Sequence, residues 1–198
     1  MSSDSVVRSL TPVAYARAVP GSDLVLIVTG PPAAGKTTVA RALAGSRPRA
    51  VHLEADAFFH FVAGGYVEPW LPESHSQNGV VMDAVAAAAA RYAAGGYFTI
   101  VDGIVAPRWL LHPLRDSLAG ARCRVAYVVL RPPLAVCEER VRARERGPLA
   151  DSGVVERLWR EFADLGPLES HVIETGSLTR EAAADVIERR LEEGRLEV

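Results

Sequence analysis

The residues best suited to chemistry stand in one run, GPPAAGKT at residues 30–37. The run matches G-x-x-x-x-G-K-[ST], in which glycines let a tight loop turn its backbone N–H groups toward phosphate oxygens. The ammonium of Lys36 would reach the β- and γ-phosphates, and the Thr37 hydroxyl would ligate Mg²⁺. The pattern predicts a nucleotide-phosphate site, with an ordinary glycine turn as the alternative. The expected site comprises Gly30, Pro31, Pro32, Ala33, Ala34, Gly35, Lys36, Thr37 and Thr38.

Lys36 is the single lysine among 22 basic residues; the other 21 are arginines. A chain with this composition uses arginine in place of lysine wherever only the positive charge of the side chain matters. A lysine that remains is expected where a compact ammonium is needed and the planar fork of arginine does not fit. Chance is the alternative, but the position of Lys36 in the glycine-rich run favours a specific role.

Two acidic residues are candidates for the remaining chemistry. A carboxylate close to the phosphates can accept the proton of an attacking hydroxyl. Asp56, at the end of a predicted strand, is the candidate base, with a surface acid or helix cap as the alternative. Asp102 ends another apolar strand, as a Mg²⁺-holding carboxylate does, with a substrate contact or a capping turn as the alternative. Glu54 is a weaker candidate for either role.

Arginines near residue 140 are candidates for contacts with the transferred phosphate, which needs positive charge around it. Arg140 and Arg144 are four residues apart on one predicted helix face, and Arg131 begins the same segment. The alternative is a solvated helix face. Aromatic residues offer a second set of candidates, because they would line an aromatic acceptor pocket or pack in the core. These are Phe58, Phe59, Phe61, Tyr66, Trp70 and Trp109.

The elements that must position these residues alternate along the chain. β-Branched and apolar runs predict strands at 24–28, 51–53, 97–102, 125–130 and 172–175. Helices are predicted at 36–45, 78–94, 107–119, 134–146, 152–165 and 179–193, and residues 57–76 are expected to be irregular. Alternating strands and helices predict an α/β fold with a parallel sheet flanked by helices. In such a sheet the carboxyl ends of the strands face the ligand crevice.

Length and composition restrict the class of protein. The 198 residues suit one domain, here residues 23–198, preceded by a polar extension over residues 1–22. A net charge of −2 argues against a protein that binds nucleic acid through a broad basic surface. No apolar run is long enough to span a membrane, and there is no secretory h-region, so a cytoplasmic protein is expected. The sequence does not indicate the oligomeric state.

The chain resembles the small P-loop kinases. Within them it is most similar to the branch of chloramphenicol phosphotransferase and tunicamycin-resistance-like proteins, with gluconate and shikimate kinases more distant. The resemblance covers roughly residues 24–193, and the similar stretches are IVTGPPAAGKTT, VHLEAD, YFTIVDG, VVLRPPLAVCEERVRARE and HVIETGSLTREAA.

This resemblance implies a three-layer P-loop NTPase fold with a five-stranded parallel sheet and a helical lid. It also implies ATP and Mg²⁺ as cofactors and transfer of the γ-phosphate to a small-molecule hydroxyl. Asp56 takes the position of the catalytic aspartate, Arg140 and Arg144 fall in the lid, and Thr175, Gly176 and Leu178 lie beside the adenine. Two alternatives stay open, namely a nucleotide-dependent binding or resistance protein without phosphotransfer, and a nucleoside, nucleotide or polynucleotide-end kinase.

Overall fold

The computed structural model describes residues 23–143 and 152–198. The extension expected over residues 1–22 and Arg144 of the expected lid lie outside the described residues. Within the described part of the chain, no helix is long and apolar enough to cross a membrane.

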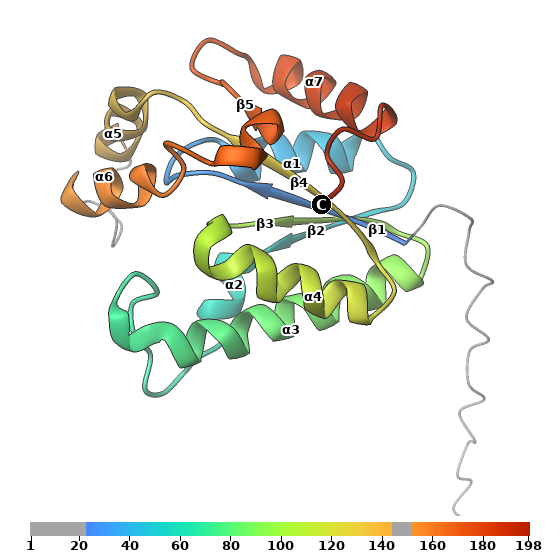
Figure 1. Ribbon diagram of the computed structural model, residues 1–198, viewed down its shortest axis with the longest axis horizontal. Helices are drawn as coiled ribbons and strands as arrows, with labels where there is room; N and C mark the ends of the chain where they lie inside the picture. Colours follow the sequence, from blue (N-terminus) through green and yellow to red (C-terminus); the bar gives the residue numbers. More distant parts are fainter. Residues whose placement is uncertain (1–22, 144–151) are drawn as a thin grey trace, which may run out of the picture.

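The centre of the fold is a five-stranded sheet in the order β2-β3-β1-β4-β5. All four strand pairs are parallel, which confirms the predicted sheet (Figure 1). The strands are β1 (Leu24–Thr29), β2 (Ala50–Glu54), β3 (Phe98–Asp102), β4 (Arg124–Leu130) and β5 (Val172–Ile173). β1 lies in the middle, so the loop that follows it opens at the point where neighbouring connections diverge, which is where α/β sheets bind ligands.

Seven helices and three short turns connect the strands within the described residues. The helices are α1 (Lys36–Gly45), α2 (Ala55–Phe59), α3 (His75–Ala94), α4 (His112–Gly120), α5 (Leu134–Ala143), α6 (Ser152–Arg160) and α7 (Arg180–Glu192). The turns are η1 (Pro72–Ser74), η2 (Pro107–Leu111) and η3 (Gly166–His171). The helix predicted over 152–165 ends earlier, at Arg160, and the one predicted over 78–94 starts earlier, at His75.

The segment after β2 corrects one prediction. Residues 57–76 were expected to be irregular, but the chain enters α2 directly after Glu54. Asp56 therefore lies in the first turn of a helix and not at a strand end. The sequence ADAFF has neither the caps nor the length of a stable isolated helix, so tertiary packing of Ala55 and Phe59 holds this turn.

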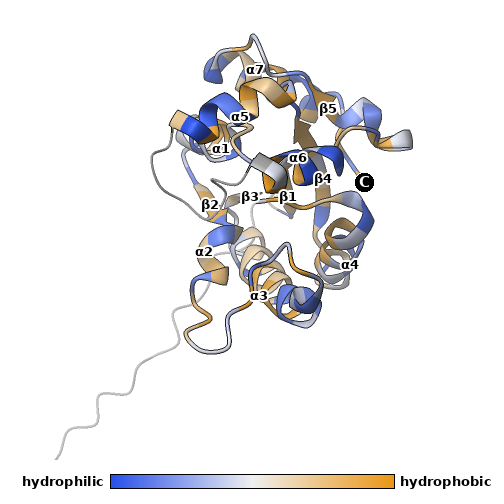
Figure 2. Cartoon of the chain, turned by 90° about the vertical axis from the view of Figure 1, so that its left-hand side faces the viewer, coloured by the Kyte–Doolittle hydropathy of each residue, from blue (hydrophilic) through white to orange (hydrophobic). Residues whose placement is uncertain are grey.

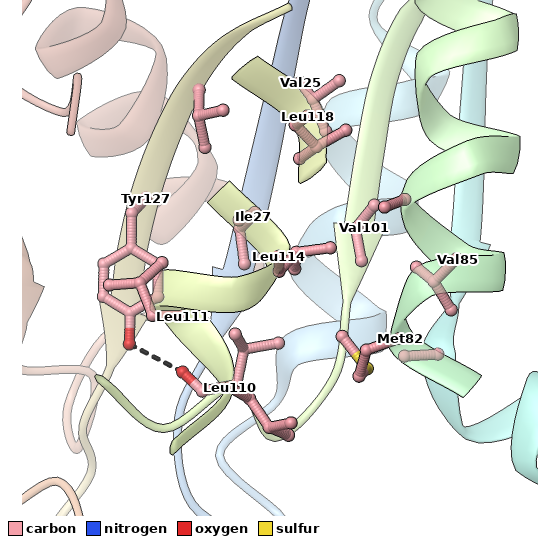
Figure 3. Packing of buried hydrophobic residues seen from close by; sticks show 14 of the residues in the cluster. Val25, Ile27, Met82, Val85, Val101, Leu110, Leu111, Leu114, Leu118 and Tyr127 are labelled. Atoms are coloured by element: carbon pink, nitrogen blue, oxygen red, sulfur yellow. Dashed lines mark hydrogen bonds between the residues drawn. The ribbon is translucent and has the colours of Figure 1, made fainter. Parts of the chain in front are cut away.

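The sheet is the middle of three layers because its residues alternate between two apolar clusters. Val25 and Ile27 of β1 belong to the cluster beneath α3 and α4, while Leu26 and Val28 belong to the cluster beneath α1 and α7. This two-residue period is that of a strand buried on both faces. Figure 2 shows hydrophobic residues concentrated in the central strands, and Figure 3 shows α3 and α4 residues packed over β1 and β3.

Tyr127 of β4 holds the segment that follows β3. Its fully buried hydroxyl donates a hydrogen bond to the Val105 carbonyl at 2.8 Å (Figure 3), and the Val105 N–H donates to Thr29 Oγ1 at 2.8 Å. Burial raises the pKa of the Tyr127 phenol well above its ordinary value, so the hydroxyl stays a donor. Both polar groups of the Val105 backbone are therefore satisfied at the edge of the site described below.

Tyr127→Phe is expected to lower the free energy of unfolding by about 1–3 kcal/mol, because it leaves the Val105 carbonyl without its donor. Urea denaturation measures this change. The matched control is Tyr92→Phe at a residue that is 43% exposed, where a change within about 0.5 kcal/mol is expected. Equal stability of the two variants would contradict the role of the hydroxyl.

Candidate active site

The phosphate loop, residues 30–37, leads from β1 into α1. Gly30 has a φ of +142°, and a Cβ added there would lie 2.1 Å from the Leu130 carbonyl oxygen of β4. Only glycine permits both the backbone conformation and this close approach. Gly35, with a φ of +97°, is the residue that caps α1 and supplies no side-chain hydrogen bond. The first N–H groups of α1 are therefore available to an anion at the start of the helix.

The Lys36 ammonium lies across this loop. Its Nζ donates hydrogen bonds to the carbonyl oxygens of Gly30 at 3.2 Å and Pro31 at 3.0 Å. Thr37 is partly buried and Thr38 is exposed. The chain thus places the ammonium and the helix N-terminus on the same short loop, which concentrates positive charge there.

Arg140 reaches the same loop from α5. Its Nη1 donates to the Ala33 carbonyl oxygen at 3.2 Å, although the two residues are 107 positions apart in the sequence. A guanidinium and an ammonium therefore meet at one loop of the described structure. Arg144, the other arginine expected on this helix face, lies outside the described residues, so only Arg140 of the pair is placed.

Arg131 has a different environment from the expected one. Its guanidinium forms a bidentate pair with Glu169, with both N–O distances 2.9 Å, and also bonds Glu174 at 2.8 and 2.9 Å. The same group donates to the carbonyl oxygens of Phe162 and Ala163. The two carboxylates raise the pKa of Arg131 further, and Arg131 lowers that of Glu169. These partners join β4 to the segment around η3, so Arg131 has a structural role, and its expected contact with phosphate stays a prediction.

Asp102 ends β3 next to the start of the loop. It is in register with Val28 of β1 and with Glu54 of β2, and it is only 3% exposed. Its Oδ2 lies 3.1 Å from His52 Nε2, but the two atoms lack hydrogen-bond alignment, and neither has another hydrogen-bonding partner among the described residues. A buried carboxylate oxygen without a donor can accept a cation.

The Asp102 site fits Mg²⁺ when phosphates are present. Among the described residues there is no cluster of three or more His, Cys, Asp or Glu that would hold a metal ion alone. Mg²⁺ does not need such a cluster, because it is usually held by one or two carboxylates together with phosphate oxygens and water. Asp102 and the Thr37 hydroxyl are the side chains that would hold it here.

The carboxylates of Asp56 and Glu54 are separated by the turn into α2. Glu54 forms an ion pair with Arg41 of α1, with an N–O distance of 2.7 Å. Asp56 is exposed and lines a cavity. The two candidates for a base, only two residues apart, therefore have different surroundings, and of the two only Asp56 lines the cavity.

The cavity has a volume of about 280 Å³ and lies between α2, α3 and the segment after β3. Four of the six aromatic candidates line it: Phe59, Tyr66, Trp70 and Trp109. Phe58 and Phe61 do not. They pack edge to face with ring centroids 5.6 Å apart, and Phe61 is 74% exposed. The remaining wall is largely aliphatic: Ala55, Met82, Ile104, Val105, Leu110 and Leu158, with Pro69, His60, Asn78 and Asp56.

Asn78 is a site residue that sequence reasoning missed. It is 4% exposed, and its Nδ2 donates to the Pro69 carbonyl oxygen at 2.8 Å and to Ser74 Oγ at 2.9 Å. These bonds hold the segment before α3 against the helix and so shape one wall of the cavity. The only signal in the sequence is an asparagine in the first turn of a helix otherwise rich in alanine and valine.

The residues expected beside an adenine follow β5, which ends at Ile173, two residues earlier than predicted. Thr175 is 5% exposed, and its carbonyl oxygen accepts a hydrogen bond from the Leu178 N–H at 3.3 Å. A Cβ added to Gly176 would lie 2.7 Å from Pro133 Cδ. This turn therefore packs closely against the segment that leads from β4 to α5, the helix that carries Arg140.

The fold and the phosphate loop define a P-loop NTPase fold of the kinase type. A family model described as an AAA domain matches residues 25–168, and the chain belongs to this family. None of the curated protein sequences is significantly similar to it.

Solved structures share the fold at low sequence identity. The tunicamycin resistance protein of Deinococcus radiodurans superposes with a TM-score of 0.62 at 23% identity, over 84% of this chain and 94% of that one. The APS kinase of Mycobacterium tuberculosis, in complex with AMPPNP and APS, superposes with a TM-score of 0.63 at 19% identity, over 85% of this chain and 96% of that one. A gluconokinase from Sinorhizobium meliloti 1021 superposes with a TM-score of 0.60 at 19% identity, over 90% of this chain and 97% of that one.

Proposed function

We propose that this protein transfers the γ-phosphate of ATP to a hydroxyl group of a small molecule. The observation that carries the proposal is the position of Asp56, an exposed residue that lines a cavity beside the end of β1, the strand that leads into the phosphate loop. The Gly103 N–H bonds the Val28 carbonyl oxygen at 3.3 Å, and a Cβ on Gly103 would lie 2.8 Å from the Ala55 Cβ. Val105, which lines the cavity, donates its N–H to Thr29 Oγ1 at 2.8 Å, and Thr29 directly precedes the phosphate loop. The proposed acceptor cavity therefore lies beside the residue at which the loop begins.

In this proposal each residue of the site has one role. The N–H groups at the start of α1 and the Lys36 ammonium bind the phosphates, and Arg140 adds positive charge over the loop. Asp56 accepts the proton of the acceptor hydroxyl as its oxygen attacks the γ-phosphorus. Thr175, Gly176 and Leu178 lie beside the base of the nucleotide. Mg²⁺, when bound by Asp102 and Thr37, neutralises charge on the phosphates.

The resemblance to tunicamycin resistance proteins and the likeness to a solved structure of that name support a place in this branch of the small P-loop kinases. The presence of AMPPNP in the APS kinase structure supports ATP as the donor. These two structures are 23% and 19% identical in sequence to this chain, which is too low for their acceptors to be assigned to it. The class of acceptor is therefore inferred from the residues that line the cavity.

The direct test is incubation of the full chain with ATP, Mg²⁺ and a panel of alcohols, with each product identified by mass. A phosphate monoester of one alcohol, formed together with ADP, is the expected result. Tight binding of both ATP and an alcohol without any phosphate ester would contradict the proposal and favour a binding protein instead.

Asp102→Asn tests the proposed metal site. The substitution keeps the shape but removes the charge, so we expect the affinity for ATP in the presence of Mg²⁺ to fall by about 10–100-fold. Affinity measured in EDTA should stay unchanged, and calorimetric titration gives both values. Asp116→Asn, at an exposed residue of α4, is the control. An equal fall with and without Mg²⁺ would exclude a metal-binding role for Asp102.

A further inference from the structure

We infer that the acceptor is an uncharged alcohol with an aromatic or similarly apolar body, bound with its hydroxyl at Asp56. The inference rests on the proposed function and names the class of molecule that the acceptor cavity takes. It excludes acceptors that carry a carboxylate, phosphate or sulfate group in this cavity.

The described cavity wall has no permanently charged cation, and His60 is its one imidazole. Among the described residues that line it, none is Arg or Lys, and Asp56 is the one carboxylate. An anionic acceptor would be desolvated without a cationic partner and would lie close to a second negative charge. Both effects oppose binding, because an unpaired charge in apolar surroundings costs several kcal/mol. A neutral acceptor meets neither penalty.

The hydroxyphenyl group of Tyr66 adds to this character. Burial raises its pKa, and the negative charges of Glu68 and Asp56 raise it further, so the phenol stays neutral. The Tyr66 hydroxyl donates to Glu68 Oε2 at 3.2 Å. Tyr66 therefore presents a neutral ring to the cavity and lies within the electrostatic influence of Asp56.

The rest of the wall suits a flat apolar group. Phe59 is only 8% exposed and Met82 only 2%, and the rings of Trp70 and Trp109 are half-buried at the same cavity. Aromatic rings and a methionine thioether pack well on an aromatic or aliphatic ligand. Eight of the fourteen lining side chains, Ala55, Phe59, Pro69, Met82, Ile104, Val105, Leu110 and Leu158, have no hydrogen-bonding group, so a polyhydroxylated acceptor would leave some of its hydroxyls without partners.

The volume of the cavity limits the size of an acceptor that it can enclose. A cavity of about 280 Å³ is at the small end of ligand pockets and holds one ring with a short chain. A second, more open pocket of about 290 Å³ has Trp70, Asn78, Trp109 and Leu158 in common with the first. Its wall carries one cation, Arg157, and one carboxylate, Glu161, so these charges balance. A longer apolar alcohol would extend into this second pocket.

The test compares two probes of the same shape that differ by one charge, the neutral 3-(4-nitrophenyl)propan-1-ol and the anionic 4-(3-hydroxypropyl)benzoate. Binding to the full chain is measured by calorimetric titration in the presence of AMPPNP and Mg²⁺, and phosphate transfer is measured separately with ATP. We expect the neutral alcohol to bind at least about tenfold more tightly, with a negative heat-capacity change that reports burial of apolar surface. A neutral alcohol that binds no better than the carboxylate overturns the inference.

A charge introduced into the wall tests the cause of the preference. Tyr66→Arg, at a residue that is 42% exposed, places a cation at the cavity and should reduce the preference for the neutral probe by about tenfold. Tyr92→Arg, at a residue of α3 that is 43% exposed and lines neither pocket, should leave it unchanged. An equal effect of the two substitutions would contradict a role for the cavity in the selection.

The two measurements separate this inference from the proposed function. Phosphate transfer to the carboxylate probe, at a rate equal to or above that for the neutral one, would overturn the acceptor class and keep the kinase. Preferential binding of the neutral probe without a phosphate ester would support the acceptor class and overturn the kinase. Preferential binding together with transfer to the neutral probe is the result expected from both.

Discussion

Asp56→Asn should lower turnover by about 10²–10⁴-fold while nucleotide affinity stays nearly unchanged. The amide keeps the shape of the side chain but accepts no proton from the acceptor hydroxyl, and general-base contributions are of this size. Asp56 lies on α2 at the cavity. Within the described part of the chain no hydrogen bond or ion pair joins Asp56 to the phosphate loop, so we expect ATP binding to stay the same. Single-turnover measurements with ATP, together with calorimetric titration of the nucleotide, give both values.

Glu54→Gln is the matched control for this experiment. The change is again from carboxylate to amide, two residues away, but Glu54 pairs with Arg41 on the sheet side of the turn. Because this pair is largely exposed, its loss should cost less than about 1 kcal/mol of stability and leave turnover within a few-fold of the wild type. A larger loss of turnover in Glu54→Gln than in Asp56→Asn would transfer the role of base to Glu54.

Lys36→Arg should lower turnover by about 10²–10³-fold although it keeps the charge. The Lys36 ammonium lies within hydrogen-bonding distance of the Gly30 and Pro31 carbonyl oxygens, inside a loop whose glycine packs against the Leu130 carbonyl. A planar guanidinium is wider and cannot occupy the space of a compact ammonium there. Loss of one positioned electrostatic donor typically has an effect of this magnitude.

The reverse exchange on the same helix is the control for Lys36. Arg41 of α1 is exposed and pairs only with Glu54 among the described residues, so Arg41→Lys should keep normal turnover. Initial rates at saturating ATP and circular dichroism of each variant separate a loss of chemistry from a loss of folding. Near-normal rates in Lys36→Arg would contradict the proposed contact between the Lys36 ammonium and the phosphates.

The sequence by itself determined the parallel sheet and the phosphate loop, because both depend on local patterns. The β-branched run of β1 is buried on both faces, which only a central strand requires. Gly30 and Gly35 adopt positive φ values that other residues rarely reach, and α1 starts directly after Gly35. Neither feature needs a distant partner to be recognised.

Tertiary structure decided the roles of the arginines. Arg131 and Arg140 follow the same strand and carry the same charge, but Arg131 meets Glu169 and Glu174, which lie 38 and 43 residues further along the chain. Arg140 meets the Ala33 carbonyl on a loop 107 residues earlier. No local pattern indicates which carboxylates or loops will surround a guanidinium, since that depends on how η3, β5 and α5 pack together.

The cavity also depends on tertiary structure alone. Its wall combines residues of α2, α3, η2 and α6 with the segment between α2 and η1 and the segment between β3 and η2. The packing of these elements places Asp56 at the cavity, whereas Glu54 pairs with Arg41. The aromatic residues were visible in the sequence, but not which of them would form the wall. Phe61 remains exposed, whereas Asn78, which no motif singles out, is buried and holds part of the wall in place. Local patterns determine the glycine-rich loop because it is built by consecutive residues, and packing determines the cavity because its residues come from across the chain.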